Sequence, residues 1–139
     1  MERLPSGWGK NISDSKKRAR MKRLFRSIAF AWQGLSNAWL TQRNFRIEIG
    51  IALAATILAI YLRTGLTPVL ICVMVVFASE LINSSIEALV DLNTQGVHPL
   101  AKAAKDYAAA AVLITSFGSL AIGILVLGPA LLERILSWL

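Results

Sequence analysis

A stripe of polar side chains interrupts an apolar stretch between residues 78 and 92. The stripe consists of Glu80, Asn83, Ser84, Glu87 and Asp91. At about 100° per residue of an α-helix, these side chains share a sector of roughly 100°, and Glu80 lies about 16 Å from Asp91 along the helix axis. A carboxylate within a membrane is costly, so Glu80 is a candidate functional residue that needs a proton, a cation or a hydrogen-bonding partner.

Charged residues at the start of two other apolar segments are candidate partners for this stripe. Arg46 and Glu48 stand at the start of the first segment, and Lys105 and Asp106 at the start of the third. Carboxylates with an amide suit Mg²⁺, which is usually held by one or two carboxylates and by substrate phosphates, and Lys and Arg suit phosphate. This combination indicates phosphoryl transfer to a molecule dissolved in the membrane, with a base that takes the proton of the acceptor hydroxyl.

The polar stripe is also compatible with two other roles. Polar residues at i, i+3 and i+7 can join transmembrane helices by hydrogen bonds, or they can line an ion pathway. The sequence contains no GxxxxGK[ST] or GxGxxG nucleotide loop and no Cys/His metal cluster. Cys72, the only cysteine, is predicted to be a packing residue, and His98 a loop or capping residue.

Three transmembrane helices are predicted to position these residues. The 139-residue chain is 55% hydrophobic but carries a net charge of +7, and its mean hydropathy is +0.58. Residues 64–79 and 107–132 contain no charged side chain, and about 20 apolar residues span the hydrocarbon core as a helix. We therefore predict an all-α membrane protein with a three-helix domain over residues 44–132 and helices over about residues 45–62, 68–92 and 104–127.

The N-terminal part of the chain is strongly basic. Nine of the 15 Lys and Arg residues lie between Arg3 and Arg26. We expect a flexible tail over residues 1–15 and a basic amphipathic helix over residues 16–43 that lies in the membrane interface. A soluble basic tail or a nucleic-acid-binding arm is the alternative, but the many Leu, Phe and Trp residues of the segment disfavour both.

The distribution of Lys and Arg predicts the orientation in the membrane. The basic N-terminus is expected in the cytoplasm, as in a multi-pass protein of a bacterial inner membrane, and residues 133–139 then form a short external tail. Five of the eight acidic residues fall at or near the cytoplasmic end of a span: Glu48, Glu80, Glu87, Asp91 and Asp106. Their concentration at one membrane surface favours a functional site.

Two segments carry a resemblance to a known family. ELINSSIEALVDL, residues 80–92, is followed by HPLAKAAKDYAAAAVLI from residue 98, and both are supported upstream by AFAWQGLSNAW, residues 29–39, and NFRIE, residues 44–48. Over about residues 23–127 the chain resembles the prokaryotic diacylglycerol kinase and undecaprenol kinase family. These are small integral-membrane lipid kinases.

The resemblance implies an assembly and a set of residue roles. It implies a homotrimer whose active sites are shared between neighbouring protomers. Glu80 would be the catalytic base, with Asn83 beside it, and Glu87 would hold the Mg²⁺ that accompanies ATP. Lys105 would meet the nucleotide phosphates and Asp106 another part of the nucleotide.

Other polar positions belong to the same predicted site. Glu48 and Arg23 match further functional positions of the family, and Arg46 and Asp91 are additional polar candidates. Gln42 departs from the family pattern, which commonly has a second metal-binding glutamate there. An amide oxygen can ligate a hard cation but adds no negative charge, so we expect weaker Mg²⁺ binding at this position or a substitute carboxylate.

The resulting prediction is a lipid kinase that transfers the γ-phosphate of ATP to a lipid hydroxyl at the cytoplasmic membrane surface. Undecaprenol and diacylglycerol both stay open as acceptors, and no nucleic-acid partner is expected. The alternative is a small oligomeric transporter in which Glu80 and Glu87 relay protons or cations. A kinase requires Lys105 and Mg·ATP, whereas a relay is indifferent to both.

Overall fold

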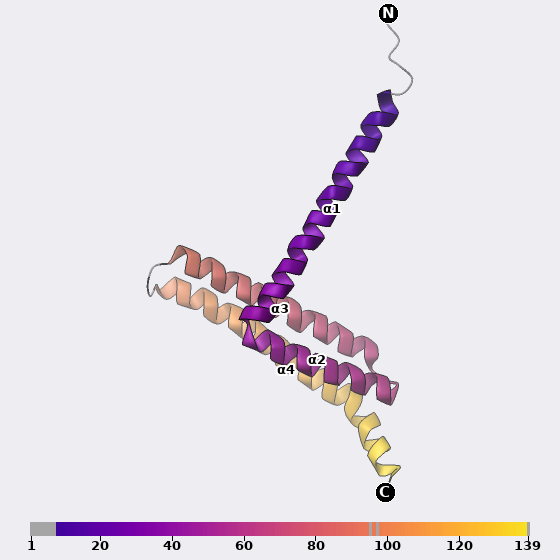
Figure 1. Cartoon of the computed structure of the whole chain (residues 1–139). Coiled ribbons are helices and arrows are strands. Elements are labelled where there is room, and N and C mark those ends of the chain that lie inside the picture. Colours follow the sequence, from indigo (N-terminus) through magenta and orange to yellow (C-terminus); the bar gives the residue numbers. More distant parts are fainter. Residues whose placement is uncertain (1–7, 95, 97, 139) are drawn as a thin grey trace, which may run out of the picture. The chain divides into compact units, whose positions relative to one another are not determined.

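The chain folds into helices, which Figure 1 shows in a computed structural model that describes residues 8–94, 96 and 98–138. In chain order these are α1, Trp8–Thr41; α2, Arg43–Leu62; α3, Leu66–Asn93; and α4, Pro99–Leu136. No strand occurs among these described residues. The prediction of an all-α fold is therefore confirmed.

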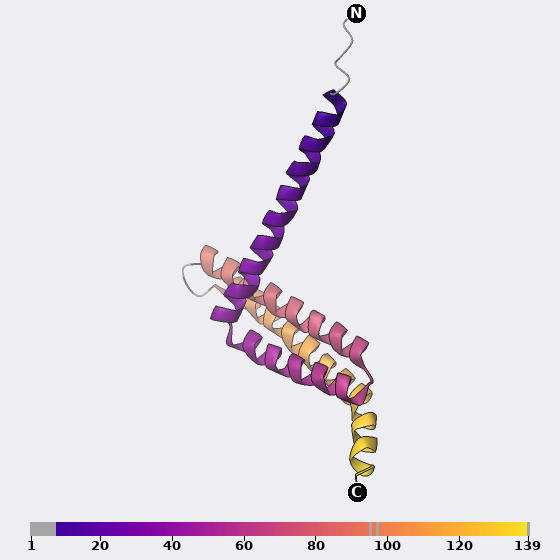
Figure 2. The ribbon, with the colours of Figure 1, turned by 45° about the vertical axis from the view of Figure 1, so that its right-hand side comes forward.

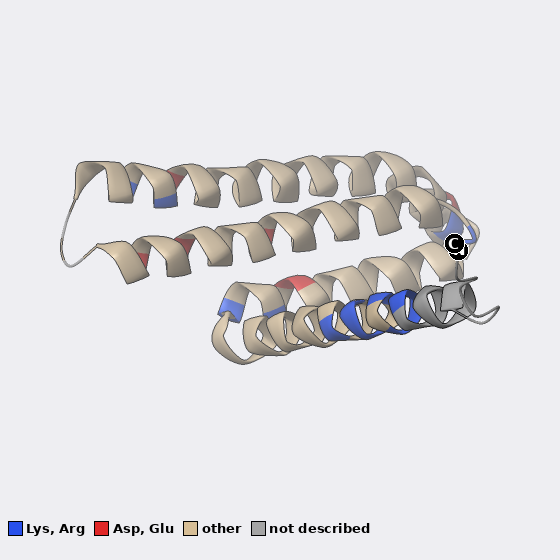
Figure 3. Cartoon of the chain, turned by 90° about the horizontal axis from the view of Figure 1, so that it is seen from above, with Lys and Arg blue, Asp and Glu red and all other residues tan. Residues whose placement is uncertain are grey.

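The chain divides into two compact units, residues 1–37 and residues 38–139. The first unit contains most of α1, whose side chains from residue 16 to residue 37 are all exposed. They include seven Lys and Arg and no acidic residue, which is why this helix carries only blue among its coloured positions in Figure 3. α1 begins at Trp8, within the range expected to be a flexible tail; residues 1–7 lie outside the described residues.

The second unit is a bundle in which α2, α3 and α4 lie side by side (Figures 1 and 2). α3 and α4 form an antiparallel hairpin with the most extensive contact, and α2 packs against both. All three are long and apolar enough to cross a membrane, which confirms the three predicted spans. Large apolar side chains such as Ile51, Met74 and Leu125 are exposed, as expected for surfaces that face lipid.

The α2–α3 connection is tight, and the end of the bundle around it is called the turn end below. Arg63 ends α2 in the left-handed region with φ 54°, and Gly65 precedes α3 with φ 69°. A Cβ on Gly65 would lie 2.4 Å from Val126 Cγ1, so this position requires glycine both for its conformation and for its close contact with α4.

α4 is longer at both ends than the predicted range of residues 104–127. It begins at Pro99, where a proline at the first helical position has no hydrogen bond to lose, and His98 Nδ1 accepts a hydrogen bond from Leu100 N at 3.2 Å. His98 is thus a capping residue, as predicted. The helix continues through Pro129 to Leu136; proline is tolerated within transmembrane helices because neighbouring groups can satisfy the freed backbone atoms.

Candidate active site

The polar stripe of α3 lies at the opposite end of the bundle, where α2 and α4 begin and α3 ends; we call this the acidic end. In Figure 3 the acidic residues follow one another along the C-terminal part of α3. Helical spacing places Glu80, Asn83 and Glu87 on one face of α3, and Asn83 Nδ2 donates a hydrogen bond of 3.4 Å to Glu87 Oε1. The polar face predicted for this helix is therefore present, and the amide of Asn83 is hydrogen-bonded to the carboxylate of Glu87.

Glu80 and Asn83 are buried, although they are polar. Glu80 is 2% exposed and Asn83 is 9% exposed. Among the described residues, four buried side-chain oxygens have no hydrogen-bond partner: Glu48 Oε2, Glu80 Oε2, Asn83 Oδ1 and Ser84 Oγ. Buried polar groups are normally satisfied, and leaving one unpaired costs about 1–3 kcal/mol. Such a group of orphaned oxygens is typical of a place that receives a donor or a cation.

The carboxylates of the acidic end repel one another. Glu80 interacts electrostatically with Glu48 on α2 and with Glu87 on its own helix. Among the described residues no three His, Cys, Asp or Glu side chains come together as a metal site built by one chain requires. Mg²⁺ usually takes several of its oxygen ligands from substrate phosphates and water.

Two ion pairs lie toward the tip of the α3–α4 hairpin. Lys105 Nζ on α4 contacts Asp91 Oδ1 on α3 at 2.6 Å, and Lys102 pairs with Asp106 one helical turn away. The side chains of Lys105 and Asp91 are 37% and 67% exposed, so their pair contributes only about 0–1 kcal/mol of stability. Its effect is to hold an ammonium group beside the last turn of the polar stripe.

The remaining predicted residues lie around or apart from this cluster. Arg46, which is exposed, donates from Nη1 to the backbone oxygen of Trp39 at 3.4 Å. Gln42 is the N-cap of α2, half-buried and without a capping hydrogen bond from its side chain. Arg23 lies exposed on α1 in the first unit, whereas the acidic end belongs to the second.

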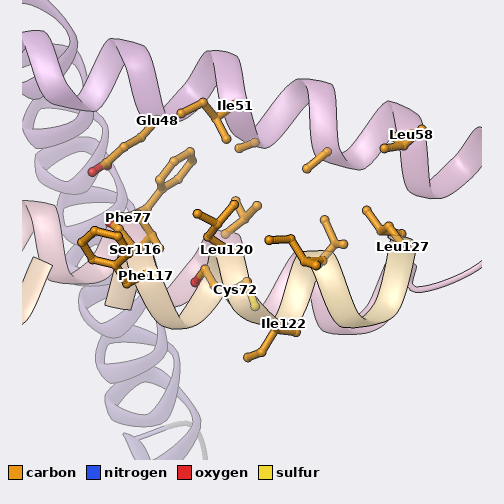
Figure 4. Close-up of a pocket in the computed structure, with 18 of the residues that line it drawn as sticks. Glu48, Ile51, Leu58, Cys72, Phe77, Ser116, Phe117, Leu120, Ile122 and Leu127 are labelled. Carbon is orange, nitrogen blue, oxygen red and sulfur yellow. The ribbon is translucent and has the colours of Figure 1, made fainter. Parts of the chain in front are cut away.

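An apolar cavity of about 690 Å³ runs between α2, α3 and α4 and reaches the acidic end. Figure 4 shows Glu48 at one end of this groove and Leu58 and Leu127 at the other. The sequence did not predict this groove. Its signal is the small residues Ala52, Ala55 and Gly123, which line it from two helices and leave space that larger side chains would fill.

A hydrogen bond across the hairpin also went unnoticed in the sequence. Ser79 Oγ on α3 and Thr115 Oγ1 on α4 lie 2.9 Å apart. Ser79 immediately precedes Glu80 in the sequence. Ser79 also donates to Val76 O at 2.8 Å. The contact of Ser79 with Thr115 links α3 to α4 at the turn that carries Glu80.

Comparison with known proteins identifies the family. The model of the prokaryotic diacylglycerol kinase family matches residues 29–127. The chain belongs to this family. The match includes every member of the predicted site from Gln42 to Asp106 and leaves out Arg23. Membership supports the lipid-kinase prediction and gives no support to the transporter alternative.

The relatives of this family member include both undecaprenol kinases and diacylglycerol kinases. The undecaprenol kinase of Bacillus subtilis is 38% identical over 117 residues, which cover 82% of this chain and 95% of that protein. The diacylglycerol kinase of Synechocystis is 40% identical over 111 residues, and the chain spans only 63% of its length. The diacylglycerol kinase of Escherichia coli K12 is 39% identical over 95 residues, or 66% of this chain and 78% of that protein. Identity alone therefore does not separate the two acceptors.

Proposed function

We propose that this protein transfers the γ-phosphate of ATP to the hydroxyl of a membrane lipid. The observation that carries the proposal is the buried, unpartnered carboxylate of Glu80 inside a membrane-spanning helix. It stands beside further carboxylates and within the same end of the bundle as Lys105. Family membership supplies the reaction class, since the named relatives are kinases of diacylglycerol or undecaprenol.

In the proposed mechanism, Glu80 is the base of the reaction. Its carboxylate accepts the proton of the lipid hydroxyl while the hydroxyl oxygen forms a bond to the γ-phosphorus and the bond from that phosphorus to the β-bridging oxygen breaks. The products are ADP and the lipid phosphate. Asn83 orients the carboxylate of Glu87, to which it is hydrogen-bonded, and positioning of this kind is the main contribution of a protein to phosphoryl transfer.

The nucleotide is proposed to bind where the hairpin supplies cations. Lys105 exchanges its contact with Asp91 for the phosphates, and Asp106 meets another part of the nucleotide. Glu87 and Gln42 are the proposed ligands of Mg²⁺, which when bound would neutralise charge on the phosphates. The orphaned oxygens of Glu48, Glu80 and Asn83 fit a hard cation nearby, and Arg46 and Arg23 are further candidates for phosphate contacts.

The proposal includes the setting of the site. We infer a multi-pass protein of a bacterial inner membrane with its N-terminus and acidic end in the cytoplasm, where ATP is present. The basic helix α1 then lies at the membrane surface. A homotrimer with shared sites is consistent with the many exposed apolar side chains of α2–α4 and with a carboxylate cluster that does not complete a metal site on one chain.

Incubation of the purified protein with Mg²⁺ and γ-labelled ATP tests the function directly. Undecaprenol and diacylglycerol are supplied in separate reactions, and Glu80→Gln is run beside the wild type. We expect label in a lipid with the wild type and its loss with Glu80→Gln. Absence of label from both lipids across a wide range of Mg²⁺ concentrations would show that the protein is not a lipid kinase.

A further inference from the structure

A second pocket lies at the turn end of the bundle, far along the helices from the carboxylates. It has a volume of about 640 Å³, within the range of about 300–1,000 Å³ that is typical of small-molecule sites. Residues 61–63 at the end of α2 line it together with residues near the end of α4. In the ranges 49–79 and 107–139 the sequence contains only three charged residues, Arg63, Glu133 and Arg134, and all three line this pocket.

The two arginines are held at the pocket by different means. The guanidinium carbon of Arg134 on α4 lies 5.4 Å from the centre of the Tyr61 ring on α2, which is a cation–π distance. Arg63 is the C-cap of α2 with φ 54°, in the left-handed region where glycine is the usual residue. Arginine is more strained than glycine in this conformation, so its presence indicates a use for the side chain.

The charges of the pocket do not neutralise one another. Within the part of the chain that the structure describes, the only ion pairs are those of Lys102 and Lys105, so Glu133 pairs with neither arginine. Guanidinium groups match the oxygens of a phosphate, and a carboxylate accepts hydrogen bonds from an ammonium group. The complementary ligand therefore carries a phosphate and an amine together.

The pocket lies at the level where a membrane ends. α2 is 20 residues long, which is about 30 Å of helix and the thickness of the hydrocarbon core, and its last two residues, Tyr61 and Leu62, line the pocket. Exposed apolar side chains such as Ile57 and Ile60 precede them on α2. A ligand whose polar group occupies the pocket would have hydrocarbon chains beside these side chains, so a lipid fits better than a soluble molecule.

We propose that this pocket binds the headgroup of a phospholipid that carries both a phosphodiester and a primary amine, as phosphatidylethanolamine does. The phosphate oxygens accept hydrogen bonds from Arg63 and Arg134, and the ammonium group donates to Glu133. Phosphatidylglycerol has no amine, and the quaternary ammonium of phosphatidylcholine has no N–H to donate. The pocket lies at the opposite end of the bundle from Glu80, so the bound lipid is not the acceptor and takes no part in phosphoryl transfer.

Photo-cross-linking tests the site without depending on catalysis. The full-length protein in detergent, without ATP or Mg²⁺, is illuminated with a phosphatidylethanolamine that carries a diazirine in one acyl chain close to the glycerol, and labelled residues are located by mass spectrometry. We expect label at the turn end, within residues 57–63 and 130–138, and its removal by excess unlabelled phosphatidylethanolamine. Label spread evenly along the helices, or confined to the acidic end, would overturn the proposal.

Competitors distinguish the chemistry of the headgroup and its source. Phosphatidylglycerol and phosphatidylcholine should need about tenfold higher concentrations than phosphatidylethanolamine to remove the label, because neither donates a hydrogen bond to Glu133 from an ammonium group. Glycerophosphoethanolamine, which is the headgroup without chains, should compete only weakly. Equal competition by phosphatidylglycerol would overturn the assignment of the amine, and equal competition by glycerophosphoethanolamine would overturn the assignment to a lipid.

Arg63→Gly separates loss of the side chain from loss of the fold. Glycine is favoured at φ 54°, so this variant should unfold no more easily than the wild type, yet its label at the turn end should fall about tenfold. Arg20→Gln, at an exposed arginine of α1, is the control and should stay within about twofold of the wild type. Equal label in the two variants would overturn the proposal.

Glu133→Gln tests the amine contact separately from the phosphate contacts. Without the carboxylate, the preference for phosphatidylethanolamine over phosphatidylglycerol as competitor should fall from about tenfold to within about twofold. Arg63→Gly should weaken both competitors and keep the preference between them. A tenfold preference retained in Glu133→Gln would show that Glu133 does not contact the amine and would overturn this part of the proposal.

Discussion

The two ends of the bundle are built on opposite principles. At the turn end, Ala59, Val69 and Leu127 form the buried apolar core, with exposures of 0%, 5% and 6%. At the acidic end, the buried residues include Glu80 and Asn83, with oxygens that lack partners in the described part of the chain. The turn end fixes the helices to one another, and the acidic end holds polar groups whose burial is costly unless a ligand arrives.

Because of this difference, stability and activity should depend on opposite ends of the bundle. A protein that places strained or unsatisfied groups at one site must be held together elsewhere, and here the tight turn at Gly65 and the contact with Val126 lie at the far end of the same helices. Variants at the two ends should therefore change different measurements. Those at the acidic end should change activity, and those at the turn end should change unfolding.

The largest expected effect is that of Glu80→Gln on activity. Without a carboxylate to accept the hydroxyl proton, phosphoryl transfer should fall about 10³-fold, within the range that a general base contributes. The unfolding midpoint should stay the same or rise, because the variant removes a buried charge. Label transfer from γ-labelled ATP and thermal unfolding in detergent measure the two effects.

Glu133→Gln is the control for that comparison, because Glu133 is an exposed acid near the turn end. Its activity should stay within about twofold of the wild type. If Glu80→Gln lost stability and activity in parallel, Glu80 would be a structural residue and the contrast between the two ends would be wrong.

At the turn end, Gly65→Ala should destabilise the bundle by about 3 kcal/mol, because a Cβ adds strain at positive φ and overlaps Val126. Activity per folded molecule should not change. Gly50→Ala is the matched control, since a Cβ there meets nothing within 4 Å, and it should be neutral or slightly stabilising. Detergent unfolding titrations followed by circular dichroism measure both, and equal stabilities of the two variants would contradict the strain at Gly65.

The sequence predicted the elements of the fold better than their ends. Apolar segments identified all three spans, although only the third contains an uncharged run longer than the roughly 20 residues that a helix needs to cross the hydrocarbon core. The start of α4 at Pro99 and its passage through Pro129 were not predicted, since proline usually interrupts a helix in water. In a membrane, backbone groups must be satisfied within the protein, and a continued helix does this.

The sequence predicted the part of the candidate site that lies on α3 alone. It did not predict the contacts that join α3 to the neighbouring helices. Glu80, Asn83 and Glu87 share a face because of helical spacing alone. The approach of Glu48 to Glu80 depends on the register of α2 against α3, and the groove depends on small side chains from two helices that face each other. Neither relation can be predicted from one segment alone, because each depends on how two helices pack against each other.

Gln42→Glu tests whether the missing charge limits metal binding at the acidic end. If Gln42 lies at the proposed Mg²⁺ site, a carboxylate there should lower the Mg²⁺ concentration for half-maximal activity about tenfold, because it adds a negative charge next to a divalent cation. Gln42→Ala should raise this concentration. A titration of activity against Mg²⁺ measures the shift, and identical curves for Gln42→Glu and the wild type would remove Gln42 from the site.

The smallest expected effect concerns the pair of Asp91 with Lys105. Both side chains are partly exposed, so Asp91→Asn should change the KM for ATP by only about threefold and leave kcat within about twofold. Because the pair is exposed to ions, raising the salt concentration should remove the difference, and Asp91→Glu should restore the wild-type KM. Steady-state kinetics at low and high salt measure these changes. A loss of kcat as large as that of Glu80→Gln would mean that Asp91 takes part in the reaction itself, and the functional region would then extend from Glu80 to the tip of the hairpin.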